Sequence, residues 1–247
     1  MIRSYVADLH VHSVLSPCAA VEMTPRNIVR HAAEYGVNII AITDHNACDN
    51  VTAALEAASD SDVTVLPGME VETKEEIHLV VLFEKMRQMK EWERFVEAHR
   101  SGRLNDEKRF GAQFVVDAGD NLLRVKEEML LTPLTAGVAE VSAQAAALEG
   151  LCIASHVDRP VYSLINQLGF IPPDVILDAV EVSRRVKPQE AARLIPAIGG
   201  LPVITASDAH TIDDFIDGPK ITLFLEKPSL AEIRQALRNQ NQRKVVV

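Results

Sequence analysis

The sequence predicts an α/β fold, because short apolar runs alternate with helical stretches along most of the chain. The runs are continuously apolar, as expected of parallel strands that are buried on both faces. They cover residues 5–9, 37–43, 63–71, 77–83, 151–156, 179–183, 202–207 and 221–225. This alternation favours an α/β barrel or a doubly wound sheet, and 247 residues are enough to form one large core.

The helices between these runs have recognisable ends. Thr24 and Pro25 have the pattern of an N-cap followed by a first turn, and Gly36 predicts where that helix stops. Ser229 and Glu232 have the spacing of a capping box and predict the start of the last helix.

One long segment interrupts the alternation of strands and helices. Residues 85–150 begin with a highly charged stretch and end with an alanine-rich one. We expect this segment to be a small helical insertion that covers the mouth of a barrel. The whole chain, residues 1–247, is then expected to form a single domain.

Composition excludes several classes of protein. Hydrophobic residues make up 47% and charged residues 24%, as in an ordinary globular domain. No apolar run approaches the roughly 18 residues of a membrane helix, and the N-terminus lacks a signal peptide, so we expect a cytoplasmic protein. The net charge is −10, and no basic stripe is visible. We therefore expect no membrane partner and no strong nucleic-acid binding.

Six of the eight histidines lie in or just after a predicted strand. In a parallel barrel the carboxyl ends of the strands meet at one rim, where active sites are built. His10 and His12 are two residues apart, so they share one face of a strand and can bind one metal ion. Asp8 is expected on the same face, where its carboxylate can orient a histidine ring.

Other strand ends carry similar side chains. A buried carboxylate or imidazole in an apolar setting must be hydrogen-bonded or bound to metal. A single such group often caps a strand end, but that explanation is implausible for five separate places. The sequence therefore predicts a metal site that also draws on Asp44, His45, Glu70, His78, His156, Asp208 and His210.

The motifs that contain these residues occur in the order DLHVH, ITDHN, GMEVE, IHLVV, ASHVD and ASDAH. Together they resemble the PHP (polymerase and histidinol phosphatase) family. The resemblance extends over about residues 5–225, apart from the insertion. It implies a distorted (βα)7 TIM-like barrel, two or three bound divalent metal ions, and hydrolysis of phosphoesters.

The resemblance also implies how the ligands are grouped. It assigns His10, His12, Glu70 and Asp208 to a first metal ion, Glu70, His78 and His156 to a second, and His45 and His210 to a third. Mixed imidazole and carboxylate ligands suit Zn²⁺, Mn²⁺ or Fe²⁺. The sequence does not choose among these three metals.

The chain departs from the family pattern at one position. The family usually offers an aspartate or histidine a few residues after the paired histidines, but that stretch reads SVLSPC here. Cys18 lies about where the missing ligand belongs. We expect its thiolate to bind the third metal ion, and the alternative is a neutral thiol beside a two-metal site.

Phosphate recognition and catalysis have further candidates. Arg159 follows the ASHVD motif and Arg184 follows a predicted strand, so both are candidate phosphate ligands. A hydroxide formed on adjacent metal ions would attack phosphorus, with Asp44 and Asp8 tuning the metal ligands. If the third ion is absent, His45 or His210 could instead protonate the leaving group.

These observations predict a metal-dependent phosphoesterase that acts on a small phosphorylated metabolite or a nucleotide. The main alternative among enzymes is an exonuclease that cleaves short oligonucleotides. A regulatory module that binds metal without catalysis and a hydrolase of C–N bonds are further candidates. The substrate, the metal and the oligomeric state do not follow from the sequence.

Overall fold

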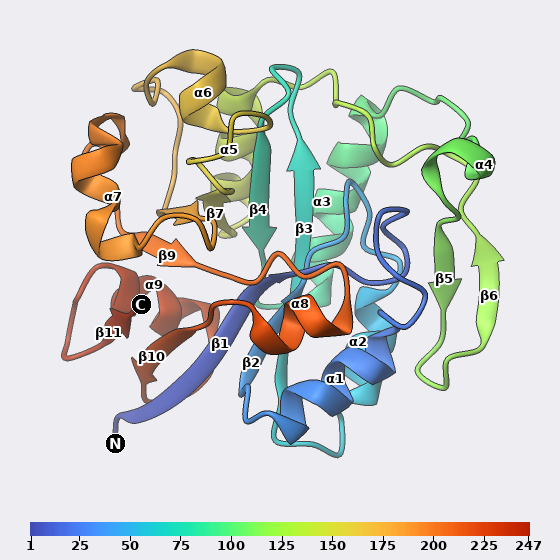
Figure 1. Ribbon diagram of the computed structural model, residues 1–247, viewed down its shortest axis with the longest axis horizontal. Helices are drawn as coiled ribbons and strands as arrows, with labels where there is room; N and C mark the ends of the chain where they lie inside the picture. The colour runs from blue at the N-terminus through green and yellow to red at the C-terminus, as the bar shows by residue number, and fades with distance from the viewer.

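The computed structural model describes residues 1–247 and contains a nine-stranded sheet that curls into a nearly closed barrel (Figure 1). The spatial order of the strands is β11-β10-β1-β2-β3-β4-β7-β8-β9. Their bounds are β1 (Arg3–Val11), β2 (Ile39–Ile42), β3 (Thr64–Glu72), β4 (His78–Leu82), β7 (Leu151–Ala154), β8 (Ala179–Val182), β9 (Val203–Thr205), β10 (Ile221–Leu225) and β11 (Lys244–Val246). The predicted α/β fold and the distorted barrel are confirmed, and each of the eight predicted strands is present.

The barrel is not all parallel. Strands β1–β2–β3 and β7–β8–β9 are parallel, but β4 pairs antiparallel with both β3 and β7. Strand β10 is antiparallel to β1, and β11 extends this edge. The barrel closes where β1 meets the segment that follows β9. Val11 and Ala209 form a bridge there, and the amide of His12 donates to the Ala209 carbonyl at 3.0 Å.

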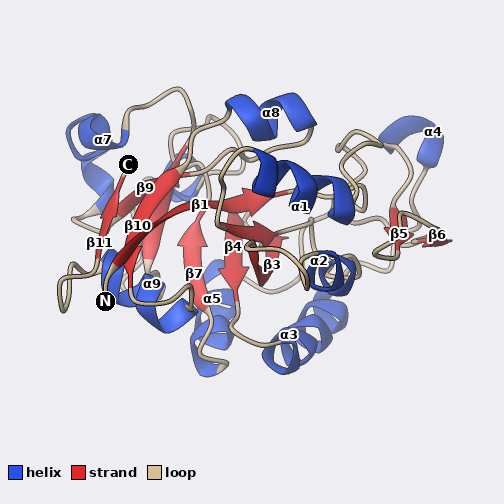
Figure 2. Cartoon of the chain, turned by 90° about the horizontal axis from the view of Figure 1, so that it is seen from below, coloured by secondary structure: helices blue, strands red, loops and turns tan.

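Helices surround the sheet, and most of them cover its outer face (Figure 2). They are α1 (Pro25–Glu34), α2 (Val51–Ala57), α3 (Met86–His99), α5 (Val138–Ala147), α6 (Leu164–Leu168), α7 (Pro188–Leu194), the 3₁₀ turn η1 (Pro196–Ile198), α8 (Ile212–Asp217) and α9 (Leu230–Leu237). The longest helix, α3, has 14 residues, and no helix of the chain has the length and apolar character needed to cross a membrane.

Side chains of each strand divide between two apolar layers. Alternate strand residues such as Ile40 and Val81 pack against the helices in a cluster of 39 buried residues. Their neighbours, such as Ile39 and Val80, fill the inside of the barrel in a cluster of 18 buried residues. Helix α9 contributes four side chains to this inner cluster and so closes one end of the barrel. The opposite end stays available for polar groups.

The segment 85–150 differs from the predicted helical insertion. Helices α3 and α5 contact β3 and β7, respectively, and so belong to the outer layer of the barrel. Between them the chain forms the short helix α4 (Glu107–Phe110) and a hairpin of β5 (Phe114–Val116) and β6 (Leu122–Val125). The hairpin lies beside the barrel (Figure 1, right). Its strands are only three and four residues long, too short to give a periodic signal in the sequence.

An ion-pair clamp holds this hairpin region against the barrel. Asp49, just before α2, pairs with Arg124 in β6 and with Lys126, whose Nζ lies 2.6 Å from the carboxylate. Burial raises the pKa of Asp49, but the two cations outweigh burial and hold that pKa below its usual value. Val115 also packs with Leu15 in a small satellite cluster.

The predicted helix ends are confirmed in part. Thr24 caps α1 by accepting a hydrogen bond from the amide of Asn27 at 3.3 Å. Ser229 is the N-cap residue of α9, but the predicted capping box is wrong, because its hydroxyl has no hydrogen-bond partner. Glu232 instead accepts hydrogen bonds from the Glu226 amide and from Arg243. Glu232 therefore pairs with Arg243 and does not accept the hydrogen bond of a capping box.

Candidate metal centre

The structure brings eight of the nine predicted metal ligands together at one end of the barrel. Most of them follow the carboxyl ends of parallel strands. His78 instead begins β4, and because β4 runs antiparallel, its first residue lies at the same end. The eight residues are His10, His12, His45, Glu70, His78, His156, Asp208 and His210.

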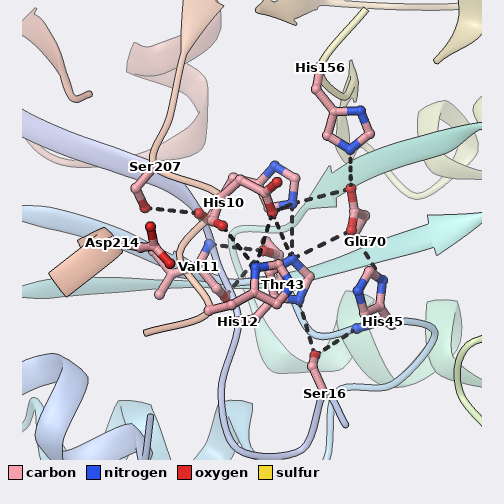
Figure 3. Close-up of polar contacts among 12 residues, drawn as sticks. His10, Val11, His12, Ser16, Thr43, His45, Glu70, His156, Ser207 and Asp214 are labelled. Atoms are coloured by element: carbon pink, nitrogen blue, oxygen red, sulfur yellow. Dashed lines mark hydrogen bonds and ion pairs between the residues drawn. The ribbon is translucent and has the colours of Figure 1, made fainter. Parts of the chain in front are cut away.

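The carboxylate of Glu70 lies at the centre of this group (Figure 3). Its side chain is 1% exposed, and nitrogen atoms of five imidazoles lie within 3.5 Å of its two oxygens. Oε1 lies 3.2 Å from His10 Nε2, 3.2 Å from His78 Nδ1 and 3.4 Å from His156 Nε2, whereas Oε2 lies 3.2 Å from His45 Nδ1 and 3.5 Å from His12 Nε2. The two oxygens of this carboxylate thus face different sets of imidazoles.

The spacing of these atoms fits a metal site. In a tetrahedral site with bonds of about 2.0–2.1 Å, neighbouring ligand atoms lie about 3.3–3.4 Å apart. The Nε2 atoms of His10 and His12 are 3.2 Å apart, and they lie 3.4 and 3.2 Å from Asp208 Oδ1. Glu70 Oε1 and His78 Nδ1 are buried without a hydrogen-bond partner. These clusters are therefore capable of binding metal ions.

Burial and charge shift the pKa values of the cluster in both directions. Burial would lower the pKa values of His10 and His78, but nearby carboxylates outweigh it, chiefly Glu181 for His10 and Glu70 for His78, and raise both. Burial would raise the pKa of Glu70, but His78 and His10 hold it well below its usual value. Burial, reinforced by His210, lowers the pKa of His12 to about 4. The pKa of His45 also falls, chiefly through burial. Ionised carboxylates and neutral imidazoles are the forms that bind a cation.

Glu181, a residue that the sequence analysis missed, orients His10. It lies in β8, is 1% exposed, and its two oxygens lie 3.0 and 3.2 Å from His10 Nδ1. A carboxylate on the far nitrogen of a histidine ligand fixes the ring tautomer and strengthens the ligand. The available signal was an ionisable residue within the apolar run AVEV, where an unpaired charge would be costly.

Asp44 acts on His12 through a serine. Its carboxylate accepts hydrogen bonds from the Ser13 amide at 2.7 Å, the Ser13 hydroxyl at 2.6 Å and the Ser16 hydroxyl at 2.7 Å. The Ser16 oxygen lies 3.0 Å from His12 Nδ1. Asp44 therefore holds in place the side chain that touches the histidine ring.

The expectation that Asp8 orients a histidine ligand is wrong. Asp8 accepts a hydrogen bond from the Ser207 amide at 3.1 Å and lies 3.3 Å from Lys220 Nζ. The strand register shifts between Asp8 and Val11, so the alternation of faces breaks: Leu9 packs inside the barrel and Val11 packs outside. Asp8 thus links β1 to the segments that follow β9 and precede β10, and it does not hydrogen-bond a histidine of the cluster.

The two predicted phosphate ligands lie in different surroundings. Arg159 is about one-third exposed, and its guanidinium lies 2.5 Å from Asp208 Oδ2, so it reaches the cluster. Arg184 is 59% exposed and pairs instead with Asp214 at 2.7 Å, without contacting a predicted ligand. The expected role of Arg184 in the site is therefore not supported, because the nearby α8 supplies a competing carboxylate.

Cys18 is not part of the clusters that the other ligands form. It is exposed and lines a cavity of about 420 Å³ together with His45 and His78. The cysteine therefore lies beside the centre, and its role as a ligand stays a prediction.

Two of the predicted ligands have strained backbones. His156 has a φ of 30° and Asp208 a φ of 51°, which is the left-handed region that non-glycine residues rarely adopt. Such conformations cost about 1–3 kcal/mol each and persist where the surrounding structure enforces them, often at functional sites.

Comparison with known proteins agrees with this geometry. The family model of the PHP domain matches residues 8–193. The 5'-3' exoribonuclease Rnm of Salmonella typhimurium is 37% identical over 82 residues, which are 31% of this chain and 27% of that protein. The lesion-specific endonuclease PfuEndoQ of Pyrococcus furiosus superimposes on 99% of this chain and 58% of its own, with a TM-score of 0.75 and 20% identity. A complex of endonuclease Q with a 27-mer duplex bearing an abasic lesion gives a TM-score of 0.74, with 19% identity and 98% and 58% coverage.

The chain belongs to the PHP domain family. Membership of this family favours the predicted class of enzyme, a metal-dependent hydrolase of phosphoester bonds. The chain spans only part of the relatives that it matches.

The same comparisons correct the predicted partners. We expected a small phosphorylated substrate and no strong nucleic-acid binding. This expectation is contradicted by a relative that is an exoribonuclease and by a structural neighbour, endonuclease Q, that was solved with a duplex substrate. The prediction relied on the net charge of −10, which sums the whole chain. Cations bound at a site dominate the local field there, so net charge says little about the substrate.

Proposed function

We propose that the protein is a nuclease, a metal-dependent phosphodiesterase that hydrolyses phosphodiester bonds in nucleic acid. The observation that carries this proposal is Glu70, whose carboxylate lies within 3.5 Å of five imidazole nitrogens. A bridging carboxylate of this kind suits adjacent metal ions, an arrangement used by many nucleases and phosphatases. The exoribonuclease and endonuclease relatives support nucleic acid as the substrate class.

The residues present fit two or three divalent ions, of Zn²⁺, Mn²⁺ or Fe²⁺. When bound, such ions lower the pKa of a coordinated water and neutralise charge on a phosphoryl group. The proposed ligands are His10, His12, Glu70 and Asp208 for the first ion, Glu70, His78 and His156 for the second, and His45, His210 and Cys18 for the third.

Residues of the chain have supporting roles in this proposal. Glu181 and the Asp44–Ser16 pair hold His10 and His12 in fixed orientations. Arg159 is the proposed phosphate ligand, since its guanidinium reaches the cluster and contacts the carboxylate of Asp208. Its planar fork of donors can bind a non-bridging phosphate oxygen and hold the scissile group against the cluster.

The test is hydrolysis of labelled single-stranded RNA and DNA oligonucleotides with Mn²⁺, Zn²⁺ or Fe²⁺, beside a panel of small phosphomonoesters. We expect cleavage of an oligonucleotide, its loss in Asp208→Asn and His10→Ala, and full activity in His99→Ala, a change on the remote helix α3. Rates should fall steeply with salt, because binding a polyanion releases counterions. Turnover of monoesters alone, or oligonucleotide cleavage that survives Asp208→Asn, would contradict the proposal.

A further inference from the structure

A cavity of about 420 Å³ opens directly beside the metal cluster. Three predicted ligands, Cys18, His45 and His78, form part of its wall. Its size falls within the usual range of small-molecule pockets, about 300–1,000 Å³. A group held in this cavity would therefore lie next to a phosphate placed on the cluster.

One wall of the cavity is an aromatic ring held in a defined position. The ring of Tyr162 stacks on that of His78, with centroids 4.6 Å apart and planes at 20°. The Tyr162 carbonyl accepts a hydrogen bond from the His78 amide at 3.0 Å. Tyr162 has a φ of 57°, a left-handed backbone conformation that persists where the surrounding structure enforces it. The residue is 42% exposed, and Leu131 and Pro133 add apolar surface to the lining.

Glu72 contributes an unusual carboxylate to the same cavity. It is 8% exposed, yet its side chain forms no hydrogen bond or ion pair with the rest of the chain. Its backbone is fixed, since its amide donates to Asn46 Oδ1 at 3.1 Å and its carbonyl accepts from the Leu134 amide at 2.8 Å. The carboxylate oxygens are not among the fully buried unpartnered atoms of the chain, so they are accessible from the cavity. A ligand that displaces water from them must offer hydrogen-bond donors in return, because a desolvated carboxylate without donors is costly.

We infer that this cavity is a nucleobase subsite selective for guanine, in which the base stacks on Tyr162 and donates hydrogen bonds to the Glu72 carboxylate. The inference rests on the proposed nuclease function and extends it to the base of the nucleotide at the cluster. Stacking on an aromatic side chain is the usual way in which proteins hold an unpaired base.

The preference for guanine follows from its donor pattern. An ionised carboxylate only accepts hydrogen bonds, and it has two oxygens side by side. Guanine presents N1–H and N2–H as two adjacent donors on its Watson–Crick edge, so both oxygens are satisfied. Adenine and cytosine place an acceptor nitrogen next to their single amino group, and uracil flanks its N–H with two carbonyls. Each of these bases would bring a lone pair against an oxygen of Glu72.

The experiment compares the binding of guanosine and inosine by calorimetry with the protein as purified. Neither nucleoside has a phosphate to hydrolyse, and inosine lacks only the N2 amino group. We expect guanosine to bind about 5- to 150-fold more tightly, the range measured for one bidentate contact to a base. In Glu72→Gln this preference should fall below about twofold, since one acceptor oxygen becomes a donor.

Matched variants separate the two contacts. Tyr162→Leu should weaken both nucleosides by about 5- to 150-fold while keeping their ratio, and Tyr162→Phe should bind like the original protein. Glu76→Gln removes an exposed charge from the same cavity and should leave the preference intact. Equal binding of the two nucleosides, absence of guanosine binding, or loss of the preference in Glu76→Gln would overturn the inference.

The failure of the inference and that of the proposed function are distinguishable. Oligonucleotide cleavage by a protein that binds guanosine and inosine equally would leave a nuclease without this subsite. A guanosine preference that depends on Glu72, in a protein that cleaves no oligonucleotide, would keep the subsite and refute the nuclease.

Discussion

Replacing Glu181 tests whether the histidine cluster is built for metal rather than for packing. In Glu181→Leu the His10 Nδ1 atom loses its partner, the carboxylate that lies 3.0 and 3.2 Å away, while both side chains are almost fully buried. Loss of such an orienting carboxylate typically reduces metal affinity by about 10- to 100-fold. This corresponds to about 1.4–2.7 kcal/mol of binding free energy. The unpaired ring nitrogen should also cost about 1–3 kcal/mol of folding free energy.

Metal affinity is measured by competition with a chromogenic chelator, and the free energy of unfolding by urea titration with and without metal. Glu181→Gln is the informative partner variant, because its side-chain oxygen can still accept from His10 and should lose less affinity than Glu181→Leu. Glu190→Gln, an exposed change on α7, is the surface control. Unaltered metal affinity in Glu181→Leu would refute the reasoning, whatever happens to stability.

Three further changes test other parts of the structure. Asp49→Asn should destabilise the protein at pH 7. Because the folded-state pKa of Asp49 is lowered, this difference should persist down to the unfolded pKa of about 3.9, shrink as the pH falls further and vanish only below the folded-state pKa, as followed by urea unfolding at pH 7 and at steps below pH 4. Arg159→Lys should keep the charge but lose the paired donors, so oligonucleotide kcat/KM should fall at least about tenfold with metal content unchanged; equal kcat/KM would exclude a bidentate phosphate contact. Gly68→Ala should cost about 1–3 kcal/mol, because an added Cβ would lie 2.8 Å from side-chain atoms of Leu82 and Thr43; an unchanged midpoint of unfolding would contradict this.

The strands and the clustered polar residues could be predicted from the sequence for the same reason. Strands buried on both faces are continuous apolar runs, and polar residues at their ends are conspicuous against that background. Glu70 is an example, because it follows a long apolar run and lies at the centre of the cluster. The hairpin of β5 and β6 escaped prediction, since its short strands are stabilised by contacts with the barrel rather than by their own pattern.

The α/β fold, and the imidazoles and carboxylates that meet at one end of the barrel, followed from the amino-acid sequence alone, because both depend on local patterns repeated along the chain. The partners of the ionisable groups became known from the folded chain. Asp8 faces Lys220 because of an irregularity in β1, and Glu181 reaches His10 although 171 positions separate them. The unpaired carboxylate of Glu72 likewise became apparent only in the cavity that it lines. Such pairings depend on strand order and on small shifts of register, and the spacing of residues along a chain carries no record of either.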